Sequence, residues 1–307
     1  MVLASLPDSS WIDEVGSLPG IELVPWDVHA ALERADEVEV VVPPYIDPDL
    51  RLDLLGRLPR LRAVQLLTAG YEQVAAHVPD GVRLCNAAGV HDASTSELTL
   101  SLILASLRGI PEFVAAQRAS TWLPTRLWPA LADKRVLVVG YGHVGKAIAS
   151  RLLPFEVEVT AVASRPRPGD DLVETVHGID ELPDLLPHHD VVVLIVPLTE
   201  ATSGLADADF LAAMPDGALL VNVARGKVVD TDALLAETST GRLRAALDVT
   251  DPEPLPTDHG LWRSPGVLIS PHIGGASTAF RPRAVQLVRA QLKAYAAGSP
   301  LANVVRG

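Results

Sequence analysis

Short runs of apolar, often β-branched residues alternate with amphipathic segments along the chain. Several runs are apolar at nearly every position. Such runs are typical of parallel strands that are covered on both faces. The pattern therefore predicts an α/β chain in which helices pack over parallel sheets. The predicted strands are Val38–Val42, Ala63–Leu67, Val136–Val139, Val157–Ala163, Val191–Val196, Ala218–Val223 and Val267–Ser270.

A domain boundary is predicted near residue 100. Glu97–Arg108 has the pattern of a long helix with an apolar face, a further helix starts near Glu112, and a proline-broken arm follows at Ser120–Pro129. Lys134 then opens a new strand and a glycine-rich turn. We expect one domain over residues 1–100 and a second over 101–284. The final segment, 285–307, resumes a helical pattern and is assigned to the first domain, which makes that domain discontinuous.

Composition narrows the class of protein. The 307 residues suit about two domains of ~150 residues each. The chain is 48% hydrophobic and 21% charged, as in ordinary globular proteins. The net charge of −13 argues against nucleic-acid binding and against a basic membrane-binding face, because both need clustered cations.

Cysteine usage and the N-terminus indicate a cytoplasmic protein. Cys85 is the single cysteine, so the chain forms no internal disulfide and no cysteine-rich metal site, and we expect no metal. The first residues lack the basic start and apolar run of a signal peptide. No apolar run approaches the ~18 residues that a membrane span requires.

The clearest local motif is a glycine-rich turn of the form G-x-G-x-x-G. It follows the strand ending at Val139 and leads into a helix over Lys146–Leu153, the setting that a dinucleotide-binding turn requires. Its three glycines allow a tight turn, close approach of a pyrophosphate, and close packing of helix on strand. Another nucleotide or a purely structural turn stays an alternative. The motif consists of Gly140, Tyr141, Gly142, His143, Val144 and Gly145.

The end of the following strand bears on the choice of cofactor. NAD sites usually place an acidic residue there, about 20 residues after the glycines, to bind the ribose 2′-hydroxyl. This chain has Ala163, followed by Ser164, Arg165 and Arg167. Arginine binds a 2′-phosphate that an acidic residue would repel. The sequence therefore favours NADP over NAD, and the alternative is that both arginines are solvated loop charges.

Three polar residues just past predicted strand ends suggest acid–base chemistry. Arg225 follows Ala218–Val223, Glu253 lies in a proline-stiffened loop, and His272 follows Val267–Ser270. Ligand sites of open parallel sheets lie at the carboxyl ends of the strands. Reduction of a 2-oxo acid needs a cation for the carboxylate and an acid for the developing alkoxide. Arg225 and His272 supply these groups, and Glu253 would stabilise the imidazolium if it bonds to His272.

These motifs, in this order, resemble the D-isomer-specific 2-hydroxyacid dehydrogenase family, and in particular its glyoxylate/hydroxypyruvate reductases. The resemblance covers nearly the whole chain. It implies two doubly wound parallel-sheet domains, with a Rossmann-type cofactor domain inserted in a flavodoxin-like substrate domain. The segments that carry it most strongly are Val191–Gly204, Leu219–Asp230, Ala246–Pro256 and Ser270–Thr278.

The resemblance also implies roles for individual residues. Arg225, Glu253 and His272 match the catalytic residues, with Arg225 and His272 also contacting substrate, and Asp248 matches the acid that holds the nicotinamide carboxamide. Further positions match cofactor-binding loops: Pro197, Thr199, Thr202, Val223, Ala224 and Gly274. The first-domain loop that meets the substrate carboxylate corresponds to Leu67, Thr68, Ala69 and Gly70. Members of the family are usually homodimers.

The expected reaction is hydride transfer between NADPH and a small 2-oxo acid such as glyoxylate or hydroxypyruvate, in a cleft between the domains, giving the D-2-hydroxy acid. Phosphoglycerate dehydrogenase is the alternative within the family, with Arg60 or Arg62 as a phosphate ligand. A dinucleotide-sensing binding protein and a methyltransferase are alternatives of other classes. Neither of these explains the Arg225, Glu253 and His272 set.

Overall fold

The computed structural model describes residues 1–307 and divides the chain into two units. Unit 1 contains residues 1–91 and 278–307, and unit 2 contains residues 92–277. Both boundaries precede those expected at residues 100 and 284. The reason is that α3 (Asp92–Leu107) is one continuous helix that packs on α5 (His143–Leu152), while α9 (Phe280–Ala296) packs on α1 (Ser9–Val15). The expected boundaries would have cut α3 and α9.

Unit 1 contains a six-stranded sheet in the order β14-β5-β4-β3-β1-β2. β1 to β5 are parallel and follow the order 2-1-3-4-5 of flavodoxin-like folds, while β14 is an antiparallel edge strand. The strands are β1 (Val2–Leu6), β2 (Ile21–Pro25), β3 (Val38–Val41), β4 (Ala63–Gln65), β5 (Arg83–Cys85) and β14 (Val304–Arg306).

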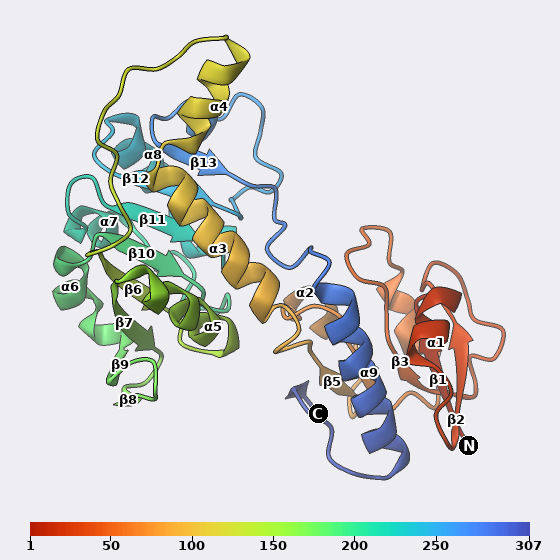
Figure 1. Cartoon of the computed structure of the whole chain (residues 1–307). Helices are drawn as coiled ribbons and strands as arrows, with labels where there is room; N and C mark the ends of the chain where they lie inside the picture. The colour runs from red at the N-terminus through yellow and green to blue at the C-terminus, as the bar shows by residue number, and fades with distance from the viewer. The chain divides into compact units, whose positions relative to one another are not determined.

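Helices cover both faces of this sheet (Figure 1). On one face α1 and α9 pack against β1 and β3 and bury Trp11, Ala284 and Val288. On the other face a 3-10 helix (Leu52–Arg57) and α2 (Glu72–Ala75) pack against β3 and β4. The short strands are therefore buried on both sides, as the continuous apolar runs at β3 and β4 predict.

Unit 2 contains an eight-stranded sheet in the order β13-β12-β11-β10-β6-β7-β9-β8. Seven strands are parallel, and β8 pairs antiparallel with β9 at the edge. From β9 to β12 the order is the Rossmann order 3-2-1-4-5-6, with β13 added beyond. The strands are β6 (Arg135–Val139), β7 (Glu158–Ala163), β8 (Arg167–Pro168), β9 (Thr175–Gly178), β10 (Val191–Leu194), β11 (Leu219–Asn222), β12 (Arg244–Leu247) and β13 (Val267–Ile269).

Successive residues of the central strands alternate between two cores. Val136 and Val138 of β6 face the core that α3 and α5 line, whereas Leu137 and Val139 belong to the opposite core. The helices on that opposite face are α6 (Leu182–Leu185), α7 (Ala208–Ala213) and α8 (Thr231–Ser239). This double coverage makes an apolar residue favourable at every position of these strands, and it confirms the predicted doubly wound class.

The hydrophobic pattern misses several strands and overextends one helix. The strands without a predicted counterpart are β1, β2, β5, β8, β9, β12 and β14. Most of them are short or carry charged residues, so their apolar signal is weak. The helical pattern assigned to residues 285–307 ends at Ala296, after which Gly298 adopts φ +66° and the chain turns back to form β14.

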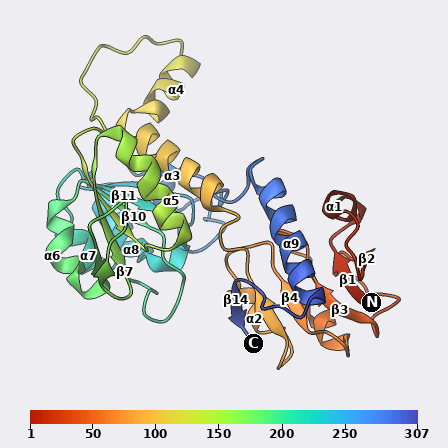
Figure 2. The same ribbon diagram turned by 60° about the horizontal axis from the view of Figure 1, so that its bottom comes forward.

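After α4 (Ile110–Arg118) the arm over residues 119–130 has no regular structure (Figure 2). Its Trp128 ring meets Phe113 of α4 edge-on at 5.1 Å and carries the Arg126 guanidinium 3.7 Å from its centroid. Trp122 and Leu127 of the arm are almost fully exposed. By length and apolar composition no single helix could span a membrane, and only α3 and α4 taken together, with a 68° bend between them, meet that test.

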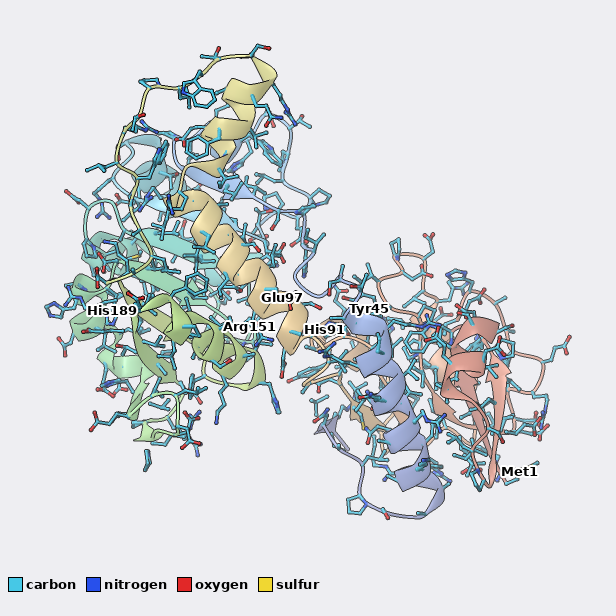
Figure 3. All side chains as sticks on the ribbon, in the orientation of Figure 1. Met1, Tyr45, His91, Glu97, Arg151 and His189 are labelled. Atoms are coloured by element: carbon cyan, nitrogen blue, oxygen red, sulfur yellow. The ribbon has the colours of Figure 1, made fainter.

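The chain passes between the units twice, and within each unit the two passing segments are joined. In unit 1 the His91 and Phe280 rings stack at 5.4 Å, and Tyr45 stacks on Phe280 at 4.1 Å; Figure 3 labels Tyr45 and His91. In unit 2 the Ser94 and Ser277 hydroxyls lie 2.6 Å apart in a hydrogen bond. Each unit thus fixes both of its connecting segments locally.

Candidate functional site

The glycine-rich turn lies between β6 and α5, where the strand order of unit 2 reverses. Gly140 has φ +110°, and a Cβ there would lie 2.3 Å from the Ile195 carbonyl oxygen after β10. A Cβ on Gly145 would lie 1.9 Å from the Gly140 carbonyl oxygen, whereas one on Gly142 would meet nothing within 4 Å. Packing therefore requires glycine at positions 140 and 145, whereas Gly142 borders open space.

Gly142 caps the ten-residue helix α5, whose first N–H groups and dipole favour an anion. Open space at Gly142 next to this helix start fits the pyrophosphate of a dinucleotide. Of the other residues of the turn, Tyr141 is buried, Val144 packs into the core beneath α3, and His143 is exposed with Nδ1 3.9 Å from the Asp92 carboxylate. We find no cluster of three or more histidine, cysteine or acidic side chains that could hold a metal ion.

The region that sequence analysis linked to the cofactor ribose lies next to this turn. Ser164, Arg165 and Arg167 are exposed after the end of β7. Arg167 Nη2 donates a hydrogen bond of 2.8 Å to the Tyr141 carbonyl oxygen, so its guanidinium lies beside the glycine-rich turn. Binding of a 2′-phosphate by Arg165 and Arg167 stays a prediction.

The loop after β10 is closed by its own hydroxyl groups. Thr202 Oγ1 donates to the Pro197 carbonyl oxygen at 2.6 Å and accepts from the Thr199 backbone N–H at 2.8 Å. All three residues belong to the predicted cofactor loop. These bonds give it a fixed shape at the carboxyl end of the sheet.

Asn222 organises the chain between β11 and Arg225, and sequence analysis did not single it out. Its buried side chain accepts from the Ala224 N–H at 3.1 Å and donates to the Arg225 carbonyl oxygen at 3.0 Å. Val223 and Ala224, assigned to the nicotinamide ribose, are thereby held in one conformation. An asparagine inside the apolar run Leu219–Val223 was the available signal, because a buried amide needs fixed partners.

Glu253 and His272 meet directly. His272 Nδ1 lies 2.5 Å from Glu253 Oε1, and both side chains are partly exposed. Arg225, which follows β11, is half-buried, and its Nη1 donates to the Ala224 carbonyl oxygen at 2.7 Å. β11, β12 and β13 are adjacent and parallel, so Arg225, Glu253 and His272 all follow carboxyl ends of neighbouring strands. A bond at Nδ1 leaves Nε2 of His272 as the nitrogen for proton exchange.

Asp248 holds the loop that carries His272. Its buried Oδ1 accepts from the Ser270 hydroxyl at 2.6 Å and from the Ile273 N–H at 2.9 Å, and its Oδ2 accepts from the Gly274 N–H at 2.8 Å. His272 itself donates its N–H to the Asp248 carbonyl oxygen and has φ +53°, in the left-handed region. The carboxylate thus stabilises a sparsely populated backbone conformation at His272. A contact of Asp248 with the nicotinamide stays a prediction.

The loop predicted to meet the substrate carboxylate lies in unit 1, after β4. Thr68 Oγ1 donates to the Gly70 carbonyl oxygen, and Asn86 Nδ2 donates to that of Ala69. Leu67 is buried in the core, and its carbonyl oxygen bonds to His91 Nε2 at 2.9 Å. Only backbone groups and the small side chains of Thr68–Gly70 are therefore presented to a ligand by this loop.

The strand order and the glycine-rich turn of unit 2 define a dinucleotide-binding α/β protein, and comparisons with known proteins specify the family. Residues 100–274 match the family model described as D-isomer specific 2-hydroxyacid dehydrogenase, NAD binding domain. The chain is 33% identical to a human glyoxylate reductase/hydroxypyruvate reductase, over 83% of this chain and 79% of the relative. It is 32% identical to a glyoxylate reductase of Thermofilum pendens, over 80% and 75%.

A crystal structure of a member of this family matches this chain over almost its whole length. The D-isomer specific 2-hydroxyacid dehydrogenase from Xanthobacter autotrophicus Py2, in complex with NADPH and MES, superposes with a TM-score of 0.83 at 29% identity and covers 99% of this chain and 97% of its own. The chain belongs to the D-isomer specific 2-hydroxyacid dehydrogenase family. It is an oxidoreductase that uses NAD or NADP and has 2-hydroxyacid dehydrogenase activity. The sensing-protein and methyltransferase alternatives are therefore set aside.

Proposed function

We propose that this protein reduces a small 2-oxo acid, glyoxylate or hydroxypyruvate, to the D-2-hydroxy acid with NADPH. The observation that carries the proposal is the 2.5 Å contact between His272 and Glu253 after strands β12 and β13 of the sheet that bears the glycine-rich turn. A histidine oriented by a carboxylate is the arrangement of a general acid–base. The names of the human and Thermofilum pendens relatives support the substrate class.

In this mechanism the bound nicotinamide cofactor supplies the hydride. His272 Nε2 donates the proton to the carbonyl oxygen as negative charge develops there, and the Glu253 carboxylate at Nδ1 orients the ring and stabilises the imidazolium. The Arg225 guanidinium binds the substrate carboxylate and polarises the carbonyl. In the reverse direction His272 Nε2 accepts the proton.

NADPH is preferred over NADH in this proposal because of the residues after β7. Ala163 stands where an acid would bind the ribose 2′-hydroxyl, and the exposed Ser164, Arg165 and Arg167 offer a hydroxyl and two guanidinium groups. Guanidinium groups bind phosphate with paired, charge-assisted hydrogen bonds. The Xanthobacter autotrophicus relative was crystallised with NADPH, which supports this choice.

We further propose that the protein is a homodimer that pairs through α4 and the arm over residues 119–130. Large apolar side chains are exposed on this segment, and Trp122 and Leu127 have 96% and 100% of their surface accessible. Large apolar side chains that a folded chain leaves exposed on one segment are typical of protein–protein contacts. A second copy of the chain would cover it, and light scattering of wild type against Trp122→Ser tests the proposal. A monomeric wild type refutes it.

The catalytic proposal is tested by following nicotinamide absorbance with purified protein. NADPH and NADH are offered separately with glyoxylate, hydroxypyruvate, pyruvate and phenylpyruvate. We expect oxidation of NADPH well ahead of NADH and the highest kcat/KM with one of the first two acids. His272→Ala lowers kcat by roughly 10²–10⁴-fold, the usual contribution of a positioned acid–base. Wild-type turnover in His272→Ala contradicts the proposed role, and a preference for NADH contradicts the cofactor choice alone.

A further inference from the structure

A short hairpin next to the glycine-rich turn carries Arg167, and its other residues have no role in the reaction described above. It is formed by β8 and β9 at the edge of the unit 2 sheet. Gly169 N–H donates to the Glu174 carbonyl oxygen and Asp170 N–H to that of Val173, so the tip is a defined turn. A Cβ on Gly169 would lie 1.8 Å from the Val173 carbonyl oxygen, so this tight turn requires glycine.

The hairpin is attached to the glycine-rich turn through Tyr141. Tyr141 is 3% exposed, and it packs with Val173 and Val176 of the hairpin. Its hydroxyl donates to Asp170 Oδ1 at 2.9 Å, while Arg167 donates to its carbonyl oxygen. One residue of the turn therefore holds both the first strand of the hairpin and its tip.

Lys146 completes the attachment from the first turns of α5. Its Nζ lies 2.8 Å from Asp170 Oδ2, and the Leu172 N–H donates to Asp170 Oδ1 at 3.1 Å. The Lys146 ammonium and these hydrogen bonds lower the pKa of Asp170 to about 2, so the carboxylate is ionised throughout the neutral range. Burial, together with the bond to Asp170, raises the pKa of the Tyr141 hydroxyl, which therefore stays a donor.

We propose that Tyr141, Lys146 and Asp170 form a clasp that positions Arg167 for the 2′-phosphate of NADPH. The clasp holds the tip of the hairpin just after Arg167, so the guanidinium keeps one N–H on the Tyr141 carbonyl oxygen and presents its others to the phosphate. Preorganisation of this kind strengthens binding because less side-chain entropy is lost. Lys146 also neutralises the Asp170 charge, which would otherwise repel the phosphate. This inference rests on the proposed use of NADPH.

The test measures cofactor binding without substrate, by fluorescence titration with NADPH and with NADH. These cofactors differ only in the 2′-phosphate, so the ratio of their Kd values isolates its recognition. The variants are Tyr141→Phe, which keeps the ring, and Asp170→Asn, which keeps the side-chain shape. Asp171→Asn is the matched control, because Asp171 is the adjacent, exposed carboxylate outside the clasp.

We expect Tyr141→Phe and Asp170→Asn to raise the ratio of the NADPH Kd to the NADH Kd by roughly fivefold to tenfold, the scale of one lost hydrogen bond. Lys146→Gln weakens NADPH further because it leaves the Asp170 charge unneutralised, and adding Asp170→Asn to it restores part of the loss. The Asp171→Asn variant binds like wild type.

Several results would overturn the clasp. Tighter NADPH binding in Asp170→Asn would mean that Lys146 itself binds the 2′-phosphate and that its ion pair with Asp170 competes with this binding. Equal weakening of NADPH and NADH would mean a general effect on the turn, and unchanged binding of both would leave the contacts without a role. If the wild-type protein binds NADPH no better than NADH, both the NADPH assignment and the clasp are refuted. If wild type and all variants prefer NADPH equally, only the clasp is refuted.

Discussion

Replacement of Asp248 by asparagine tests how firmly the loop that carries His272 is held. The carboxylate accepts three hydrogen bonds, two at Oδ1 and one at Oδ2. An asparagine whose oxygen keeps the Ser270 and Ile273 bonds must turn its amide N–H₂ toward the N–H of Gly274, which is a donor facing a donor. In the opposite orientation the amide N–H₂ donates to the Ser270 hydroxyl, which can also accept, but it faces the N–H of Ile273. Either arrangement therefore loses one charge-assisted bond and leaves a buried N–H unpaired.

A lost bond of this type costs about 1.5–3 kcal/mol of folding free energy. For a unit the size of residues 92–277 that lowers the unfolding midpoint by roughly 3–12 °C. Circular dichroism melting of Asp248→Asn measures the shift, with Asp258→Asn, at an exposed position, as control. Because His272 is on the same loop, kcat falls in parallel. An Asp248→Asn variant that melts within about 1 °C of wild type would show that the carboxylate does not hold the loop.

Three further predictions concern the glycine-rich turn, the buried His189 and the proposed substrate-binding residue Arg225. Gly140→Ala abolishes measurable NADPH binding in fluorescence titration, because φ +110° and the 2.3 Å approach to Ile195 exclude a Cβ; binding at wild-type strength would contradict this. Burial lowers the pKa of His189, so the unfolded chain takes up a proton that the folded protein resists, and wild type loses stability as the pH falls below the ordinary value of 6.5. The variant His189→Gln should lack this loss of stability, which chemical denaturation of both proteins between about pH 7.5 and 5 measures. If the stability of wild type and variant falls equally with pH, His189 is not its cause. Arg225→Lys lowers kcat/KM for the 2-oxo acid by roughly 10–100-fold because paired hydrogen bonding is lost, and kinetics near wild type would exclude that pairing.

The central strands of unit 2 were predictable because they are buried on both faces. β6, β10 and β11 are apolar at nearly every position, and this pattern is visible without any knowledge of their partners. β5 and β12 contain arginine, and β9 contains histidine within four residues. Their assignment depends on neighbouring strands that are distant in the sequence, so the local pattern was too weak.

The candidate site divides in the same way. The glycine-rich turn has a fixed local spacing, whereas the bond between His272 and Glu253 entered the sequence analysis only as the condition for a role of Glu253. The bonds of Tyr141 with Asp170, and of Asp248 with residues 270–274, join segments more than twenty residues apart. Nothing in the spacing of these residues indicates which carboxylate meets which donor, because that depends on where the hairpin and the loop fold back.

The split of unit 1 into residues 1–91 and 278–307 has a consequence for biosynthesis. The helix α9, which buries Ala284, Val288 and Leu292 against one face of the unit 1 sheet, is translated after the whole of unit 2. Until then the apolar residues Ala4, Leu6 and Val40 lack their α9 covering. The growing chain therefore carries an incomplete sheet at its amino end while unit 2 has all its residues. Chaperones that bind exposed apolar strands have this interval in which to act, and it closes when α9 docks.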